Sequence, residues 1–204
     1  MLMNDNTKYG VIILAAGNSS RMNTVKSFLK YDSNRCFIEK IIDTYLSFHC
    51  KEIILVKNSH QSQWSEIENI YKNTNLQIIN NSKQELGRFY SLKLASKSIN
   101  KIDHCFIQNS DNPFVDYRLL QSLSLNKNKG DYQVPIFNQK GGHPILLNNK
   151  IISDIIKSTH FSNLNEFLKQ YHRTNIQCDN KHILTNVNTP TDYRELIDKQ
   201  EIYV

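Results

Sequence analysis

Apolar runs of strand length alternate with longer amphipathic stretches through the first half of the chain. The apolar runs predict buried strands over 9–15, 52–56, 76–80 and 104–108. The amphipathic stretches predict helices over 36–48, 61–73 and 88–99. This strict alternation is typical of right-handed βαβ crossovers and a mainly parallel sheet. The predicted fold class is therefore α/β, with functional groups gathered beyond the carboxyl ends of the strands.

The second half of the chain alternates less strictly. Strands are predicted within YQVPIF (132–137) and PILL (144–147), helices over 149–157 and 163–171, and a last helix after Pro190. No internal repeat and no clear linker separates the two halves. We therefore expect one domain over residues 1–204.

The composition is that of an ordinary globular chain of 204 residues, 39% hydrophobic and 22% charged. No apolar run approaches the roughly 18–20 residues that cross a membrane, and the first residues are polar rather than signal-like. We expect a cytoplasmic protein without a membrane partner. The 4 cysteines are scattered without a CxxC pair, so free and mostly buried thiols are predicted.

The formal net charge of +6 leaves room for an anionic ligand. Lysine and arginine are spread along the chain, and no RRM, KH or helix-turn-helix signature is present. A nucleic-acid-binding module is therefore the weakest alternative. A phosphate-rich small molecule fits the charge without being required by it.

The stretch VIILAAGNSSRMNTVK (11–26) ends a predicted strand in small residues and then in two cations five positions apart. These residues are Ala15, Ala16, Gly17, Ser19, Ser20, Arg21 and Lys26. Small residues let backbone N–H groups approach a ligand, and the hydroxyl and cationic groups add donors. The stretch predicts a polyphosphate cradle, although it matches neither the Walker loop nor the dinucleotide fingerprint. From composition alone, a tight βα turn with two solvated cations is the alternative.

The segment QNSDNP (108–113) follows the fourth predicted strand and places Asp111 at the ligand edge of the sheet. Mg²⁺ is typically held by one or two carboxylates plus substrate phosphates, so Asp111 is a candidate metal ligand. The alternative is that Asp111 caps the helix beginning near Asp116, but the spacing would put that cap nearer Val115.

LAAGNSSRMNTVK (14–26) resembles the LAAGxSxRMGxxK signature of nucleotidyltransferases that attach a nucleoside monophosphate to a phosphorylated acceptor. It is most similar to the MobA/MocA-like branch, which includes molybdopterin cytidylyl- and guanylyltransferases. Asn23 departs from the usual Gly but leaves Arg21 and Lys26 in register. The resemblance implies a three-layer Rossmann-like fold with a mainly parallel central sheet. The nucleotide contacts that it implies are Leu14, Ala15, Ala16, Gly17, Ser19, Ser20, Arg21, Lys26, Gly87 and Ser91.

Later motifs extend the resemblance over residues 10–196. SDNP (110–113) is similar to a GDQP-like motif, which implies Asp111 as a Mg²⁺ ligand. GRFYSL begins with Gly87 and brings Ser91 four residues later, the spacing of a nucleotide-facing segment. GGHPILL looks like the GHP motif of MocA-like members, which implies that Gly142 and His143 lie on the acceptor side.

The closing segment NVNTP (186–190) is ambiguous. It resembles a D-I-D-T-P segment with Asn186 and Asn188 in place of both acids, whereas guanylyltransferase members often carry N-x-N-T-P. A carboxamide oxygen can bind a metal or hold a metal-bound water, so Asn188 stays a candidate second ligand. Thr189 before Pro190 also predicts a helix N-cap.

The activity implied is Mg²⁺-dependent transfer of CMP, or secondly GMP, from CTP or GTP to a phosphorylated small molecule such as a molybdopterin-type cofactor, with release of pyrophosphate. Arg21, Lys26 and Asp111 would be its catalytic residues. Residues 8–125 would form the nucleotide-binding half, and 126–204 the acceptor-side half with the C-terminal helix. A nucleotide-binding accessory protein without turnover is the alternative, because Asn186 and Asn188 replace acids. Base preference, acceptor and oligomeric state are left open.

Overall fold

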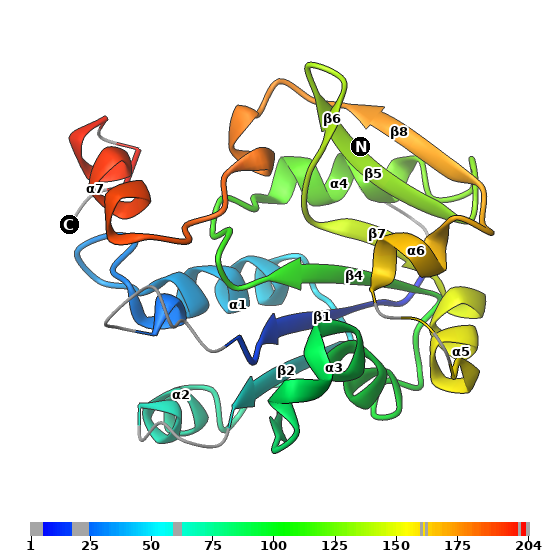
Figure 1. Ribbon diagram of the computed structural model, residues 1–204, viewed down its shortest axis with the longest axis horizontal. Coiled ribbons are helices and arrows are strands. Elements are labelled where there is room, and N and C mark those ends of the chain that lie inside the picture. Colours follow the sequence, from blue (N-terminus) through cyan, green and yellow to red (C-terminus); the bar gives the residue numbers. More distant parts are fainter. Residues whose placement is uncertain are drawn as a thin grey trace.

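The computed structural model describes residues 6–17, 25–58, 63–159, 161, 163–199 and 201–202. Four parallel strands form the centre of its sheet: β1 (Tyr9–Ala15), β2 (Glu52–Asn58), β3 (Leu76–Asn81) and β4 (His104–Asn109). Their order is β3-β2-β1-β4, so β1 is flanked by β2 and β4 (Figure 1). These are the four strands predicted from the apolar runs, and the α/β fold with a mainly parallel sheet centre is confirmed.

The second half of the chain extends the same sheet beyond β4. Its strands are β5 (Tyr132–Phe137), β6 (Lys140–Gly141), β7 (Ile145–Asn148) and β8 (Arg173–Gln177). β7 runs antiparallel to β4 and to β5, whereas β8 pairs with β5 in parallel. The hydrophobic pattern predicted β5 and β7 but not β6 and β8. The two missed strands are short and mostly exposed, so they carry little apolar signal.

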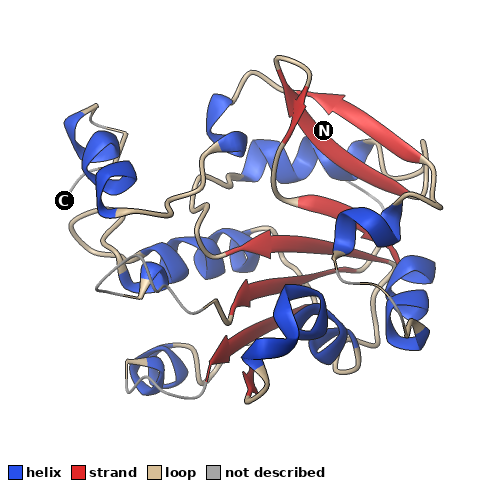
Figure 2. Ribbon diagram, in the orientation of Figure 1, coloured by secondary structure: helices blue, strands red, loops and turns tan. Residues whose placement is uncertain are grey.

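Helices cover both faces of the sheet (Figure 2). The helices are α1 (Phe37–Ser47), α2 (Trp64–Ile70), α3 (Gly87–Ser96), α4 (Tyr117–Leu125), α5 (Asn149–Lys157), α6 (Leu164–Leu168) and α7 (Pro190–Asp198). In β1, Val11 and Ile13 pack with α1, α2 and α4, while Ile12 and Leu14 pack with α3, α5 and α6. Because strand side chains alternate between faces, this division gives the three predicted layers.

α7 stands apart from these layers and begins as predicted. Thr189 is its N-cap and accepts a hydrogen bond from the Asp192 backbone N–H at 3.1 Å, with Pro190 in the first turn. The Asp192 carboxylate accepts from the Thr189 backbone N–H in return, which completes a capping box. The predicted cap is confirmed, and it fixes the chain that enters α7 from the sheet.

The four cysteines are free, as predicted: Cys50 and Cys105 are buried, and Cys36 and Cys178 are partly buried. Burial raises the pKa of the Cys36 thiol to about 12. Among the described residues, every helix is too short or too polar to span a bilayer.

Candidate functional site

A cleft of about 220 Å³ opens at the carboxyl ends of β1 and β4. Its lining includes eight of the residues predicted to contact nucleotide or metal, namely Leu14, Ala15, Ala16, Gly17, Lys26, Gly87, Ser91 and Asp111. Ser27, Gln84, Arg88 and Ser110 complete it and were not predicted. The predicted Ser19, Ser20 and Arg21 lie outside the described residues. The fold therefore brings residues from four separate segments to one cleft.

Two glycines of the cleft leave its wall open. A Cβ at Gly17 would meet no atom of the described residues within 4 Å. Gly87 has a φ of +82°, a conformation that disfavours residues with a side chain, and a Cβ there would also meet nothing. Below it, the buried Ser91 Oγ accepts a hydrogen bond from Asn81 Nδ2 at 2.9 Å. Backbone is thus accessible to a ligand at both ends of the cleft.

The loop that carries Asp111 is held by two buried side chains. The Gln108 amide donates to the carbonyl oxygens of Asn109 and Asn112, both at 2.8 Å, and accepts from the Tyr45 hydroxyl at 3.0 Å. Asn112 Nδ2 donates to the Ile183 carbonyl at 3.1 Å. Backbone bonds from Ser110 to Leu14 and from Val187 to Asp111 connect the loop to β1 and to the C-terminal segment. The position of Asp111 is therefore fixed by the folded core.

The Asp111 carboxylate itself has few partners. The residue is 9% exposed, and its buried Oδ1 has no hydrogen-bond partner in the part of the chain that the structure describes. Its Oδ2 lies 4.0 Å from Arg88 Nη2. Asp116, not Asp111, caps α4 by accepting from the Leu119 N–H at 2.8 Å, so the capping alternative for Asp111 is excluded. A buried carboxylate oxygen without a donor fits a cation supplied with the ligand.

Among the described residues, no group of three or more His, Cys, Asp and Glu is placed to hold a metal ion.

Lys26, which lines the cleft, is hydrogen-bonded to Asn188 of the C-terminal segment. Lys26 Nζ donates to Asn188 Oδ1 at 2.6 Å, and the Asn188 backbone N–H donates to Asp192 Oδ2 at 2.8 Å. Although burial opposes it, the backbone hydrogen bonds from Asn188 and Thr189 lower the pKa of Asp192. The carboxamide oxygen predicted as a metal ligand therefore accepts a hydrogen bond from an ammonium group in this structure. Its role as a metal ligand stays a prediction.

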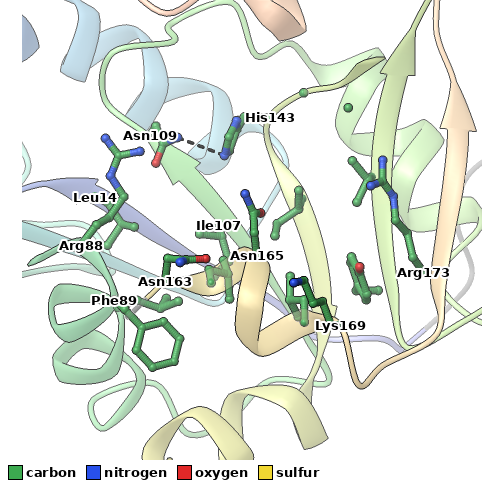
Figure 3. A pocket seen from close by; sticks show the side chains of 18 residues that line it. Leu14, Arg88, Phe89, Ile107, Asn109, His143, Asn163, Asn165, Lys169 and Arg173 are labelled. Atoms are coloured by element: carbon green, nitrogen blue, oxygen red, sulfur yellow. Dashed lines mark hydrogen bonds between the residues drawn. The ribbon is translucent and has the colours of Figure 1, made fainter. Parts of the chain in front are cut away.

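A second cavity of about 560 Å³ lies beside the first, against β5, β7, α3 and α6 (Figure 3). Gly142 and His143, both predicted on the acceptor side, line it. A Cβ at Gly142 would lie 2.4 Å from the Ile183 carbonyl oxygen, so only glycine allows this close approach. The His143 backbone N–H donates to the same carbonyl at 3.1 Å. The Gly-His segment is thereby pinned to the C-terminal part of the chain.

His143 points at the end of β4. Its Nε2 lies 3.0 Å from Asn109 Nδ2, drawn as a dashed line in Figure 3. Burial lowers the pKa of His143; Asp111 opposes this shift and Arg88 adds to it. A neutral ring that accepts from Asn109 at Nε2 carries its proton on Nδ1. Burial therefore disfavours the charged form of His143 beside Asn109.

The two cavities share Leu14 and Arg88 and are therefore contiguous. Arg88, Asn109, Lys169 and Arg173 line them and were missed from the sequence. Arg88 could have been predicted as a lining residue from its position directly after Gly87. Lys169 and Arg173 could not, because their place depends on the unpredicted strand β8 and on the packing of α6.

The family model described as "MobA-like NTP transferase domain" matches residues 11–174. The chain is 28% identical over 183 residues to the molybdenum cofactor cytidylyltransferase of Escherichia coli K12, covering 89% of this chain and 92% of that protein. It is 27% identical over 208 residues to a probable molybdenum cofactor guanylyltransferase of Clostridium perfringens SM101, covering 96% of this chain and 99% of that protein. A nucleotidyl transferase structure from Methanothermobacter superposes with a TM-score of 0.74 at 19% identity, covering 96% of this chain and 98% of that one.

Proposed function

We propose that this chain, which belongs to the MobA-like NTP transferase family and is a nucleotidyltransferase, moves a nucleoside monophosphate from CTP or GTP to a molybdopterin-type acceptor with Mg²⁺ as cofactor. The observation that carries the proposal is the Asp111 carboxylate, which is buried, lacks a partner at Oδ1 and lines the smaller of two contiguous cavities. One cavity suits a nucleotide and the other an acceptor.

Enzymes of this family commonly use a divalent metal ion. Asp111 fits such an ion because its buried Oδ1 is free of protein donors and its loop is fixed by Gln108 and Asn112. Bound there with substrate phosphates, Mg²⁺ would supply charge neutralisation for phosphoryl transfer. The remaining work of binding and orientation falls to the chain's own side chains and backbone.

The nucleotide phosphates would be held by the open end of β1 and by Lys26. Ala15, Ala16 and Gly17 line the cleft with small side chains or none, and the Lys26 ammonium donates a hydrogen bond to Asn188. A preorganised ammonium at this point stabilises the charge that develops as pyrophosphate leaves. Arg21, outside the described residues, stays a predicted second cation for the same phosphates.

The acceptor phosphate would enter from the larger cavity. Arg88 lines both cavities, and His143, whose pKa is lowered by burial, lines the larger one. An acceptor phosphate beside Arg88 would be next to the α-phosphate of a nucleotide in the smaller cleft. This arrangement supports in-line attack by proximity alone, without a covalent protein intermediate.

The test is pyrophosphate release from CTP, GTP, ATP and UTP, each with purified molybdopterin-type cofactor, with Mg²⁺ or with EDTA. We expect release with CTP or GTP that requires both the acceptor and Mg²⁺. The Asp111→Asn variant should lose activity by at least about a hundredfold, while the matched Asp116→Asn variant, in which Asn is still a good helix cap, keeps it. Nucleotide binding without any pyrophosphate release would identify an accessory binder instead.

A further inference from the structure

The larger cavity has a one-sided charge. Its lining includes the cations Arg88, Lys169 and Arg173, and none of the described residues that line it is Asp or Glu. A cavity lined by one sign of charge attracts ligands of the opposite sign. Any ligand that fills it is therefore expected to be anionic at more than one point.

The cations of this cavity stand at two ends. Figure 3 shows Arg88 beside Asn109 at the end next to the nucleotide cleft, and Arg173 across the cavity, with Lys169 between α6 and the far wall. Arg88, at the near end, already has a role in the proposed reaction, which is to bind the acceptor phosphate. Lys169 and Arg173, at the far end, have no role in it so far.

Arg173 is positioned for a ligand by its neighbours. Its Nε donates to Asn175 Oδ1 at 2.7 Å, which leaves the two Nη groups for other acceptors. A Cβ at Gly141 would lie 2.8 Å from Arg173 Nη2, so the missing side chain lets the guanidinium lie across β6. Within the described part of the chain, neither Arg173 nor Lys169 takes part in an ion pair.

Between the two ends the lining is largely apolar, with two carboxamide side chains. The apolar residues include Phe89, Leu92, Val134, Ile145, Leu164 and Leu168, and the carboxamides are Asn163 and Asn165. Such a surface suits a flat or bulky body that presents a few polar atoms, such as a heterocycle.

We infer that Lys169 and Arg173 form a specificity subsite for a second anionic group on the acceptor, at the end opposite its reacting phosphate. The acceptor class is then a phosphate ester with an apolar or heterocyclic body and a second anionic substituent, rather than a small polyol phosphate. This inference rests on the proposed function, since it takes the larger cavity as the acceptor site.

A binding experiment tests the subsite without turnover. Pterin-6-carboxylate carries an anionic group that unsubstituted pterin lacks, and both are fluorescent. The wild-type protein should bind pterin-6-carboxylate about tenfold more tightly than pterin, the size of one hydrogen-bonded charge contact. The Lys169→Gln/Arg173→Gln double variant should lose that preference, and the exposed control Lys150→Gln/Arg118→Gln should keep it. Equal affinity in the wild type, or a preference that survives in the double variant, overturns the inference.

Kinetics separate this inference from the proposed function. With molybdopterin-type cofactor as acceptor, the double variant should raise the acceptor KM at least about tenfold while the NTP KM stays within about threefold. If the wild type releases no pyrophosphate with any NTP, the proposed function fails while the pterin preference still decides the subsite. If it does and the acceptor KM of the double variant is unchanged, the subsite alone is refuted.

Discussion

At the scale of single residues, the Asp111 side chain contributes little to the stability of the folded chain. An unsatisfied buried polar atom costs about 1–3 kcal/mol, and Oδ1 is such an atom. Its backbone carbonyl, by contrast, accepts from the Val187 N–H at 2.9 Å and is kept by any substitution. The loop is therefore stabilised by its backbone and its neighbours, while the side chain is available for a ligand.

We predict that Asp111→Ala leaves the free energy of unfolding unchanged or raises it by up to about 1 kcal/mol, because it removes an unsatisfied buried oxygen. Urea denaturation without nucleotide or metal measures this. A loss of more than about 1 kcal/mol would mean that the carboxylate has a structural partner in the folded protein.

Lys26 and Asn188 act as one unit in the structure, with Nζ and Oδ1 2.6 Å apart. We predict that Lys26→Gln lowers kcat by about 10²–10³-fold, the usual cost of one preorganised transition-state donor. Asn188→Ala should lower kcat about tenfold, and the double variant should be no worse than Lys26→Gln alone, because Asn188 works through Lys26.

The same series distinguishes a metal-binding role for Asn188. If Asn188 Oδ1 leaves Lys26 to bind Mg²⁺, the Asn188→Ala variant should need much more Mg²⁺ for half-maximal rate. The losses in kcat caused by Lys26→Gln and by Asn188→Ala should then be additive in the double variant. Lys30→Gln, an exposed lysine near the cleft segment but outside its lining, is the control that should behave as the wild type.

At the scale of elements, the decisive piece is the loop between β4 and α4. Gln108 is fully buried, and its amide closes this loop through two carbonyls and the Tyr45 hydroxyl. The apolar run predicted β4, and the resemblance implied the role of Asp111. The hydrophobic pattern did not indicate which side chains hold the loop between β4 and α4. A buried amide network depends on partners far away in sequence, which no local pattern reports.

We predict that Gln108→Leu lowers the free energy of unfolding by at least about 2 kcal/mol, because several buried polar groups lose their partner together. It should also weaken Mg²⁺-dependent nucleotide binding, since the Asp111 loop loses its support. Urea denaturation and nucleotide titration measure the two effects. The exposed Gln77→Leu on β3 is the control, and equal effects in both variants would contradict the role given to Gln108.

At the scale of the whole molecule, the sequence predicted the parallel centre of the sheet but not its far edge. Long apolar strands such as 9–15 and 104–108 can be predicted from the sequence because both of their faces are buried. β8 is exposed along most of its length and is recognised only by its pairing with β5. For that reason the cleft at the ends of β1 and β4 could be predicted, and so could Gly142 and His143 of the larger cavity, whereas Arg173 could not.

The C-terminal part of the chain also gives the molecule an acid-sensitive contact. His182 stacks on Phe114 at 4.7 Å between ring centroids, and its buried Nδ1 has no hydrogen-bond partner among the described residues. Burial lowers the pKa of His182, and Lys181 adds to this while Glu201, 3.7 Å away, opposes it. The unfolded imidazole, with a pKa of about 6.5, therefore binds protons more readily than the folded one.

We predict that the free energy of unfolding falls as pH drops from 6.5 to 5, because the unfolded state gains protons that the folded state resists. The paired carboxylates with lowered pKa, such as Asp192, add their loss only nearer pH 4. Urea denaturation from pH 7 to pH 5 measures the slope. His182→Gln should flatten it relative to the wild type, and the exposed His49→Asn should not; identical slopes in all three proteins would refute this assignment.

The measurement that tests the central claim most directly is thermal unfolding with CTP and with GTP, each with and without Mg²⁺, on the wild type and on Asp111→Asn. A nucleotide at a hundredfold excess over its Kd should add about 2.7 kcal/mol of stability. We predict that one of the two stabilises the wild type strongly only with Mg²⁺, and that Asp111→Asn abolishes the gain. Stabilisation that is independent of Mg²⁺ and survives in Asp111→Asn, or no stabilisation by either nucleotide, would contradict the account of this cleft.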